Sequence, residues 1–566
     1  MGSHRRILRA SWPVGAMWLL YALACAGAWQ SWRVSGWPVG SFWWDELALS
    51  GAVHAMNAGL KPAVDFWAPF ILPLYVKQFS QSLWGGGAGY VLECLLQGGM
   101  VLLMLSGILG FRRHPASVYL FGGLIVVMAI LPFNIGSFVQ ARLGDVVYAG
   151  VYNRLGGALI MLALMLPVVW NVGEDRFDLC FWVGLLLSLA FFVKVTVFQI
   201  VLLSIVSYGF VANERGWWVL ILKGVFVSFL IVGGWLIYSG VASGYLGSVR
   251  EVSVMRAENF VEHRDGWLGL IALHRFELFV LVFFALLHVC RARVIGGAWL
   301  IPVVWYGFVV TLVTLFMLTN YGDNGLFPAM AAMFALSISV PRRPASNGGD
   351  LLMHERFDAV VKKSSQALLV LALIAYLALN SVWLVAFFAR LSSSVFAPAA
   401  VKSSFFQKSP LLDVNSWRER TPLHVPGVPR NMQSVETFAG YIEGLDEGAS
   451  ILRRHFPERG TSVYALDFPA YVFSLMEGFR VPRGTRPWLL FGHEINVDHH
   501  PPAQLLFADV DVLMVSKCSL SGGNRRYLGR IYRLEIEKNW SLVEASRCWD
   551  AYQRVKGPGR PAEVVN

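Results

Sequence analysis

Long apolar runs, each of roughly 18 residues or more, recur between short polar loops throughout the chain before residue 393. About 20 apolar residues in a helix cross the ~30 Å hydrocarbon core of a bilayer, so each run is predicted to be a membrane span. Only 15% of the 566 residues are charged, whereas soluble domains contain about a quarter. We therefore expect a polytopic α-helical membrane domain over residues 1–392 and a soluble domain over residues 393–566.

Basic residues beside the apolar runs predict the orientation of the chain. Clusters such as Arg5-Arg6-Arg9 and Arg112-Arg113 lie at the ends of apolar runs. Because Lys and Arg are retained in cytoplasmic loops, the N-terminus is expected in the cytoplasm, and the net charge of +11 is attributed to topology rather than to a nucleic-acid partner. An odd number of spans then places the C-terminal domain on the opposite side.

About 11 spans are predicted, at residues 12–32, 88–110, 117–135, a run ending near 171, 178–193, 195–212, 218–238, 267–290, 297–317, 325–340 and 365–391.

The C-terminal domain has the pattern of a mixed α/β unit. A helical pattern covers residues 433–455, and a turn is expected at Gly522-Gly523. Alternation of helices and strands in one soluble unit predicts helices layered on a sheet. The expected strands are residues 461–465, 510–515, 530–536 and 541–544.

Two cysteines, Cys518 and Cys548, fall in this C-terminal domain. Disulfides form outside the cytoplasm, so the predicted orientation permits a bond between them. Two free thiols are the alternative.

The first outer loop carries the pattern most suggestive of chemistry. Asp45 and Glu46 follow an aromatic cluster, an amphipathic helix runs to Gly59, and a proline-bearing segment extends from Pro69 to Trp84. Two carboxylates at a low-dielectric boundary affect each other's pKa, and one of them can be tuned as a general base. The alternative is structural, because acidic residues also suit the positive end of a helix dipole.

Other polar positions follow in a definite order along the chain. Asp145 lies in the second outer loop, Lys194 separates two apolar runs, and the turn T-N-Y-G-D-N-G-L-F-P precedes a later span. Together with the first outer loop, this order over residues 1–391 resembles the GT-C superfamily of membrane glycosyltransferases that use polyprenyl-phosphate sugars, such as aminoarabinose transferases and protein O-mannosyltransferases. The resemblance implies a GT-C-like membrane domain in a bacterial inner membrane, with a periplasmic C-terminal domain.

The resemblance also implies roles for individual residues. Asp45 is similar to the catalytic base of the family, and Glu46 and Asp145 would position the acceptor or help to hold a divalent metal such as Mg, Mn or Ca. For Asp145, pairing with Arg142 or Arg154 is an equal alternative. The remaining candidates for substrate binding are Asp65, Asp323, Asn324 and His263.

A lipid phosphate as leaving group requires fixed positive charge at the site. Lys194 and Arg256 are the first candidates for this role, followed by Arg250 and Lys77. A charge between two apolar runs is costly and is by default a functional-site hypothesis, which favours Lys194. One departure from the family pattern is that Val195 follows this lysine where glycine is usual. The alternative for each cation is interfacial snorkelling or pairing with acidic residues of its own loop.

A second polar cluster, His493, Asp498 and His499, lies in the C-terminal domain. These residue types are metal ligands, but their spacing matches no zinc signature, and a structural loop is the alternative. No Walker A or G-x-G-x-x-G sequence follows a predicted strand, so no nucleotide cofactor is expected.

The function expected from the resemblance is inverting transfer of a monosaccharide from a polyprenyl-phosphate donor to a glycan, lipid-linked saccharide or protein acceptor. An oligosaccharide polymerase or ligase is one alternative. A transporter or flippase of envelope lipids is another, although transporters carry charges at mid-membrane and here the charges gather at the outer interface. A non-enzymatic scaffold is the third, and it would leave Asp45 without a role.

Overall fold

The computed structural model of the 566-residue chain describes helices from both halves of the sequence and one small sheet. The residues described are 14–19, 21–22, 43–84, 86–110, 151–170, 177–212, 215–262, 308, 312, 438–492, 494–519 and 521–555. Their longer helices are α2 (Trp43–Asn57), α3 (Leu72–Trp84), α4 (Gly86–Leu109), α6 (Val151–Val169), α7 (Phe177–Val193), α8 (Val195–Ala212), α9 (Arg215–Ser239), α10 (Ala242–Glu262) and α18 (Phe438–His455). The remaining elements are β1 (Val463–Leu466), α19 (Val472–Glu477), α20 (Ala503–Leu506), β2 (Val512–Ser516), α21 (Gly522–Ile531), α22 (Arg533–Asn539), β3 (Trp540–Ala545) and β4 (Trp549–Arg554).

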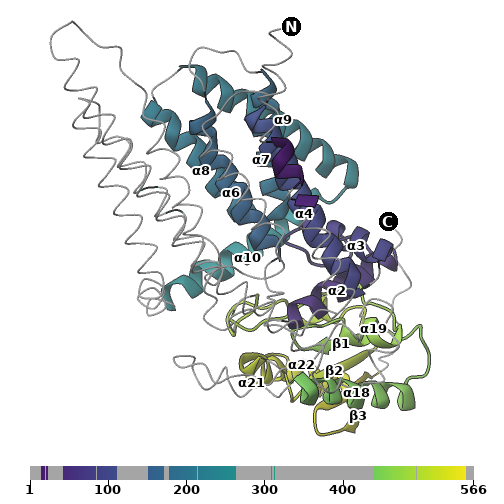
Figure 1. Cartoon of the computed structure of the whole chain (residues 1–566). Helices are drawn as coiled ribbons and strands as arrows, with labels where there is room; N and C mark the ends of the chain where they lie inside the picture. The colour runs from purple at the N-terminus through teal and green to yellow at the C-terminus, as the bar shows by residue number, and fades with distance from the viewer. Residues whose placement is uncertain are drawn as a thin grey trace, which may run out of the picture.

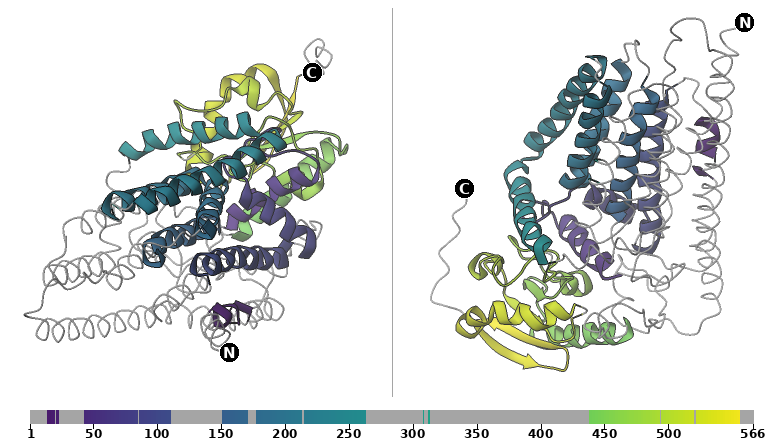
Figure 2. Two further views of the ribbon diagram at one scale, coloured as in Figure 1. Left: turned by 90° about the horizontal axis from the view of Figure 1, so that it is seen from above. Right: turned by 90° about the vertical axis from the view of Figure 1, so that its left-hand side faces the viewer.

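The chain is mostly helical, with the mixed sheet confined to its C-terminal part. Helices α4 and α6 to α9 form a bundle, and the C-terminal domain lies at one end of it, next to α2 and α10 (Figures 1 and 2). The bundle has its own apolar core, to which all five of these helices contribute buried side chains. A second core joins α2, α3 and α10 to the C-terminal domain.

Two of the described helices, α4 and α9, are long and apolar enough to cross a membrane, and α6, α7 and α8 contain shorter apolar segments. The predicted spans 88–110, 178–193, 195–212 and 218–238 coincide with α4, α7, α8 and α9. Helix α9 exposes large apolar side chains, including Leu222, Phe226 and Phe229. A contiguous apolar surface of this kind is typical of a helix that contacts lipid. The predicted spans 117–135, 267–290, 325–340 and 365–391 lie outside the described residues, and only residues 308 and 312 of the predicted span 297–317 are described.

Helices α7 and α9 approach closely because glycines lie at their contact. A Cβ on Gly184 would come within 2.6 Å of Val227, and a Cβ on Gly224 within 2.6 Å of Val183. Small residues that allow two backbones to approach are characteristic of packing between membrane helices.

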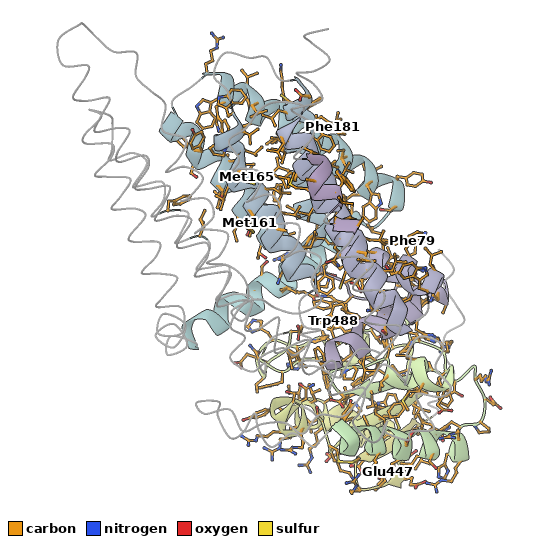
Figure 3. All side chains as sticks on the ribbon, viewed as in Figure 1. Phe79, Met161, Met165, Phe181, Glu447 and Trp488 are labelled. Atoms are coloured by element: carbon orange, nitrogen blue, oxygen red, sulfur yellow. A yellow bond between two sulfur atoms is a disulfide. The ribbon has the colours of Figure 1, made fainter. Side chains whose placement is uncertain are left out.

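Helix α3 has its polar and apolar faces reversed relative to a helix of a soluble protein. Lys77, Ser80 and Gln81 are buried, whereas Phe79 and Leu83 are more than half exposed. Phe79 lies on the outer side of the structure in Figure 3. Because an exposed apolar face is costly in water, this arrangement is typical of a helix that lies along a membrane surface.

The C-terminal domain contains a four-stranded sheet in the order β1-β2-β4-β3. Strands β1 and β2 are parallel, with Val463 opposite Val512, and β4 runs antiparallel to both β2 and β3. Helix α18 packs against β4 through the buried Trp549, whose indole donates to the Gly444 carbonyl at 2.7 Å. The predicted layering of helices on a sheet is confirmed.

Two local predictions are wrong. Residues 530–536 are helical rather than extended, because Leu528, Tyr532 and Ile536 recur at helical spacing and are buried together. The pair Gly522-Gly523 begins α21 instead of forming a turn, since the Ser521 side chain accepts a hydrogen bond from the Asn524 amide and caps the helix. The region between the predicted spans 218–238 and 267–290 contains α10, whose Tyr245 packs in the same core as residues of the first loop.

Candidate active site at the junction of the first loop and the C-terminal domain

Helix α2 presents the acidic pair of the first loop. Asp45 and Glu46 lie in its first turn; their side chains are outside the described part of the structure. The helix ends as predicted before Gly59, which adopts a positive φ of 89°. The Leu60 amide then donates to the Ala55 carbonyl at 3.0 Å, which closes the helix end.

The C-terminal domain packs directly against α2 and the segment that follows it. The Trp67 amide donates to the Thr485 carbonyl at 3.0 Å, and the Gly484 amide donates to the Asp65 carbonyl at 2.7 Å. Trp488 stacks on Phe70, with ring centroids 5.1 Å apart and planes within 4°. Figure 3 shows Trp488 between the first-loop helices and the C-terminal domain. The first loop and this domain therefore pack against each other at the end of the bundle.

Lys194 lies at the break between α7 and α8, as predicted for a turn between two apolar runs. It is partly buried, and its amide donates to the Ala190 carbonyl at 2.9 Å. The Ile71 amide of the first loop donates to the Phe192 carbonyl at 3.3 Å, and the Tyr245 hydroxyl of α10 donates to the Phe191 carbonyl at 3.0 Å. Three segments far apart in the sequence thus meet around this lysine.

Helix α10 brings basic residues to the same junction. Arg250 is exposed, and the neighbouring Glu251 forms an ion pair with Arg486 of the C-terminal domain at 2.6 Å. Arg256 lies in the same helix, with its side chain outside the described part. Burial raises the pKa of Tyr245, so its phenol remains a hydrogen-bond donor at neutral pH.

Asp65 is engaged in the turn of the first loop. One carboxylate oxygen accepts from the Lys61 amide at 2.8 Å, and the other lies 4.0 Å from the Arg483 guanidinium. These contacts give Asp65 a structural role in the turn. Its role in substrate binding stays a prediction.

Lys77 is placed differently from the other candidate cations. Its side chain is 1% exposed and forms an ion pair with Glu93 of α4 at 3.4 Å. Gln97 also donates to Glu93, at 3.4 Å. Since Glu93 balances this charge inside the structure, we leave Lys77 out of the phosphate site proposed below.

The candidate metal ligands of the C-terminal domain are only partly described. The amides of Asp498 and His499 donate to the Asn496 side-chain oxygen at 2.9 Å and 2.5 Å, and both residues are exposed. Within the described ranges, no group of three His, Cys, Asp or Glu residues is arranged to hold a metal ion. The candidates Asp145, His263, Asp323, Asn324 and His493 lie outside the described residues.

Cys518 and Cys548 form a disulfide across 30 residues of sequence. Beside it, the Ser519 hydroxyl donates to the buried carboxylate of Asp467, which also accepts from the Tyr441 hydroxyl at 3.0 Å. The disulfide therefore lies next to the polar centre of the C-terminal domain.

Arg486 is the residue of this junction that the sequence did not single out. In the sequence it is one arginine among several, in R-G-T-R-P-W, and no spacing rule relates it to residue 251. Its importance arises from a contact between positions 235 residues apart.

Comparisons with known proteins give a likeness in fold alone. No protein-family model matches the chain, and no curated protein matches it. Among solved structures, it is similar over nearly its full length to ArnT from Cupriavidus metallidurans.

The apo structure of ArnT has a TM-score of 0.45 and 11% identity, covering 96% of this chain and 99% of the other. The structure of ArnT bound to undecaprenyl phosphate has a TM-score of 0.43 and 10% identity, with the same coverage. At these values the likeness assigns no residue role.

Proposed function

We propose that this chain is an inverting membrane glycosyltransferase that moves a monosaccharide from a polyprenyl-phosphate donor to a glycan, lipid-linked saccharide or protein acceptor. The proposed location is the outer face of a bacterial inner membrane. One observation carries the proposal: α2 with its acidic first turn, the Lys194 turn and helix α10 with Arg250 and Arg256 all meet the C-terminal domain around one shared core. A base and cations for a leaving phosphate are the groups this reaction requires.

In the proposed step, the acceptor hydroxyl oxygen forms a bond to the anomeric carbon while the bond from that carbon to the phosphate oxygen breaks. The hydroxyl proton passes to Asp45, and the electron pair of the broken bond leaves with the phosphate. Attack from the side opposite the leaving group inverts the configuration, as in inverting glycoside hydrolysis. A positioned general base contributes about 10²–10⁴-fold to such a reaction.

The leaving group gains negative charge during the step. The donor phosphodiester has one charge, and the released monoester has close to two at neutral pH, because the second pKa of a phosphate ester is about 6. Lys194 and the arginines of α10, Arg250 and Arg256, are the proposed counter-charges. A cation held in a low-dielectric site stabilises such developing charge more than it would in water.

Glu46 and Asp145 are proposed to orient the acceptor. Their carboxylates also suit Mg²⁺, Mn²⁺ or Ca²⁺, which prefer oxygen ligands. No step of the proposed mechanism passes through a metal.

The test uses the purified full-length protein with radiolabelled polyprenyl-phosphate sugars and envelope extracts as the acceptor source. We expect label transfer by the wild type and a loss of about 10²-fold or more in Asp45→Asn. The control is Glu443→Gln, which removes an exposed carboxylate from α18. Absence of transfer from every donor, or full activity of Asp45→Asn, would overturn the proposal.

A further inference from the structure

A short segment of the C-terminal domain, residues 483–488, is bound to the first loop by backbone hydrogen bonds. Its backbone pairs with the loop on both sides of a bridge between Phe66 and Thr485. The Tyr471 hydroxyl and the Thr485 hydroxyl lie 2.7 Å apart and fix the segment to the rest of the domain. These contacts fix the position of the Arg486 backbone independently of the contacts made by its side chain.

The guanidinium of Arg486 connects three parts of the chain. It donates to a carboxylate oxygen of Glu251 on α10 at 2.6 Å and to the Glu494 carbonyl at 3.1 Å. Its central carbon lies 4.8 Å from the ring centre of Trp67, in the first loop. The planar guanidinium can hydrogen-bond at its edge and stack on its face at the same time, which a lysine ammonium cannot do.

This guanidinium is almost fully withdrawn from solvent. Its side chain is 9% exposed, whereas Glu251 is 53% exposed. A buried charge costs several kcal/mol unless it is paired, so Glu251 is required to face Arg486. The contact therefore fixes the rotation of α10 about its own axis at this point.

The rotation of α10 matters because, among the described residues, only one other side chain of this helix forms a hydrogen bond to another element. About two turns before Glu251, Tyr245 hydrogen-bonds to the Phe191 carbonyl, close to Lys194. Arg250 directly precedes Glu251, and Arg256 follows in the same helix. A change in the rotation of α10 would move both arginines relative to Lys194.

We propose that Arg486 is a positioning residue through which the C-terminal domain orients α10 for binding of the donor phosphate. This inference rests on the proposed function. On this inference the C-terminal domain contributes to binding of the donor and does not serve only to recognise the acceptor.

The first test measures the position of α10 without any substrate. Hydrogen exchange of the peptide spanning residues 242–255 is compared in the full-length wild type, Arg486→Gln and Arg547→Gln. The control arginine pairs with Glu447 at 3.7 Å, at the far end of the same domain (Figure 3). We expect at least tenfold faster exchange in Arg486→Gln only, with exchange of β1 and β2 unchanged as a check that the domain is folded. Unchanged exchange of α10 would overturn the inference.

The second test measures affinity for a polyprenyl phosphate by native mass spectrometry of the detergent-solubilised protein. We expect about tenfold weaker binding in Arg486→Gln and in Glu251→Gln, and partial recovery in the exchanged pair Glu251→Arg/Arg486→Glu. The Arg486→Lys variant should remain weak, because it cannot stack on Trp67 and bond Glu251 together. Wild-type binding in Arg486→Gln would overturn the positioning role. No binding by the wild type would instead overturn the proposed function, while the exchange result still decides whether Arg486 orients α10.

Discussion

Gly244 of α10 lies against the backbone of Ala63 in the first loop, so closely that a Cβ on the glycine would be 1.6 Å from the Ala63 carbonyl oxygen. Ala63 itself has a positive φ of 63°, which is uncommon for a residue with a side chain. The two backbones are thus in direct contact, and Gly244 has no room for a Cβ. This contact sets the distance between α10 and the loop that follows the acidic helix.

The first prediction concerns this contact. Gly244→Ala should lower the free energy of unfolding by about 1–3 kcal/mol, since a backbone atom must move to admit the methyl group. It should also lower transfer activity, because α10 is displaced from the first loop. Thermal unfolding of the full-length protein and the radiolabel assay provide the measurements.

The matched control is Gly247→Ala in the same helix. No atom lies within 4 Å of a Cβ at this position. Because alanine has a higher helix propensity than glycine by about 1 kcal/mol, this variant should be as stable as the wild type or more stable. Equal effects of the two substitutions would show that the contact with Ala63 does not set the position of α10.

The helices that carry the candidate site could largely be predicted from the sequence. Apolar length and flanking polar residues located α4, α7, α8 and α9, and the glycine at position 59 located the end of α2. The break at Lys194 could be predicted for the same reason, since a charge interrupts two apolar runs. These features depend on neighbours along the chain, which the sequence displays directly.

What could not be predicted depends on distant contacts. Helix α10 mixes apolar and polar residues along its length, and no local sequence pattern predicts its contacts with Ala63 and Arg486. Arg486 has no sequence signal, because its burial requires Trp67 and Glu251 to come together in the fold. The error at residues 530–536 had a usable signal, namely the spacing of four between Leu528, Tyr532 and Ile536.

The second prediction distinguishes two roles for Lys77. The structure pairs this buried lysine with Glu93, so Lys77→Met should lower the free energy of unfolding by about 3–5 kcal/mol by leaving a buried carboxylate without its counter-charge. The double variant Lys77→Met/Glu93→Met should recover much of this loss. Thermal unfolding of the wild type, Lys77→Met, Glu93→Met and the double variant gives the coupling energy.

A role for Lys77 in phosphate binding would give the opposite pattern. Lys77→Met would then weaken binding of a polyprenyl phosphate with little loss of stability, and the Glu93 substitution would bring no recovery. Native mass spectrometry on the same samples separates the two outcomes.

The third prediction concerns the disulfide between Cys518 and Cys548. A bond that closes a loop of this length stabilises by about 3–4 kcal/mol through restriction of the unfolded chain. The variant Cys518→Ala/Cys548→Ala should therefore unfold at a lower temperature than the wild type. A reductant should lower the unfolding temperature of the wild type and leave that of the double variant unchanged; equal unfolding temperatures of the two proteins without reductant would contradict the prediction.

The last prediction concerns the buried carboxyl of Asp467. Burial raises its pKa above the ordinary value, although it accepts hydrogen bonds from Ser519, the Phe468 amide and Tyr441. The folded chain then binds this proton more tightly than the unfolded chain does. The contribution of Asp467 to stability is consequently most favourable below the unfolded pKa of about 3.9 and is lost as pH rises through the folded pKa.

Asp467→Asn removes this titration while keeping a side chain of the same shape. We expect the difference in the free energy of unfolding, wild type minus variant, to fall as pH rises above about 4, by at most ~1.4 kcal/mol per pH unit. Urea unfolding of the full-length protein, followed through exchange protection of β1 and β2, measures this difference at each pH. A difference that stays constant or rises with pH would mean that Asp467 is ionised in the folded domain, because the donors around it would then outweigh its burial.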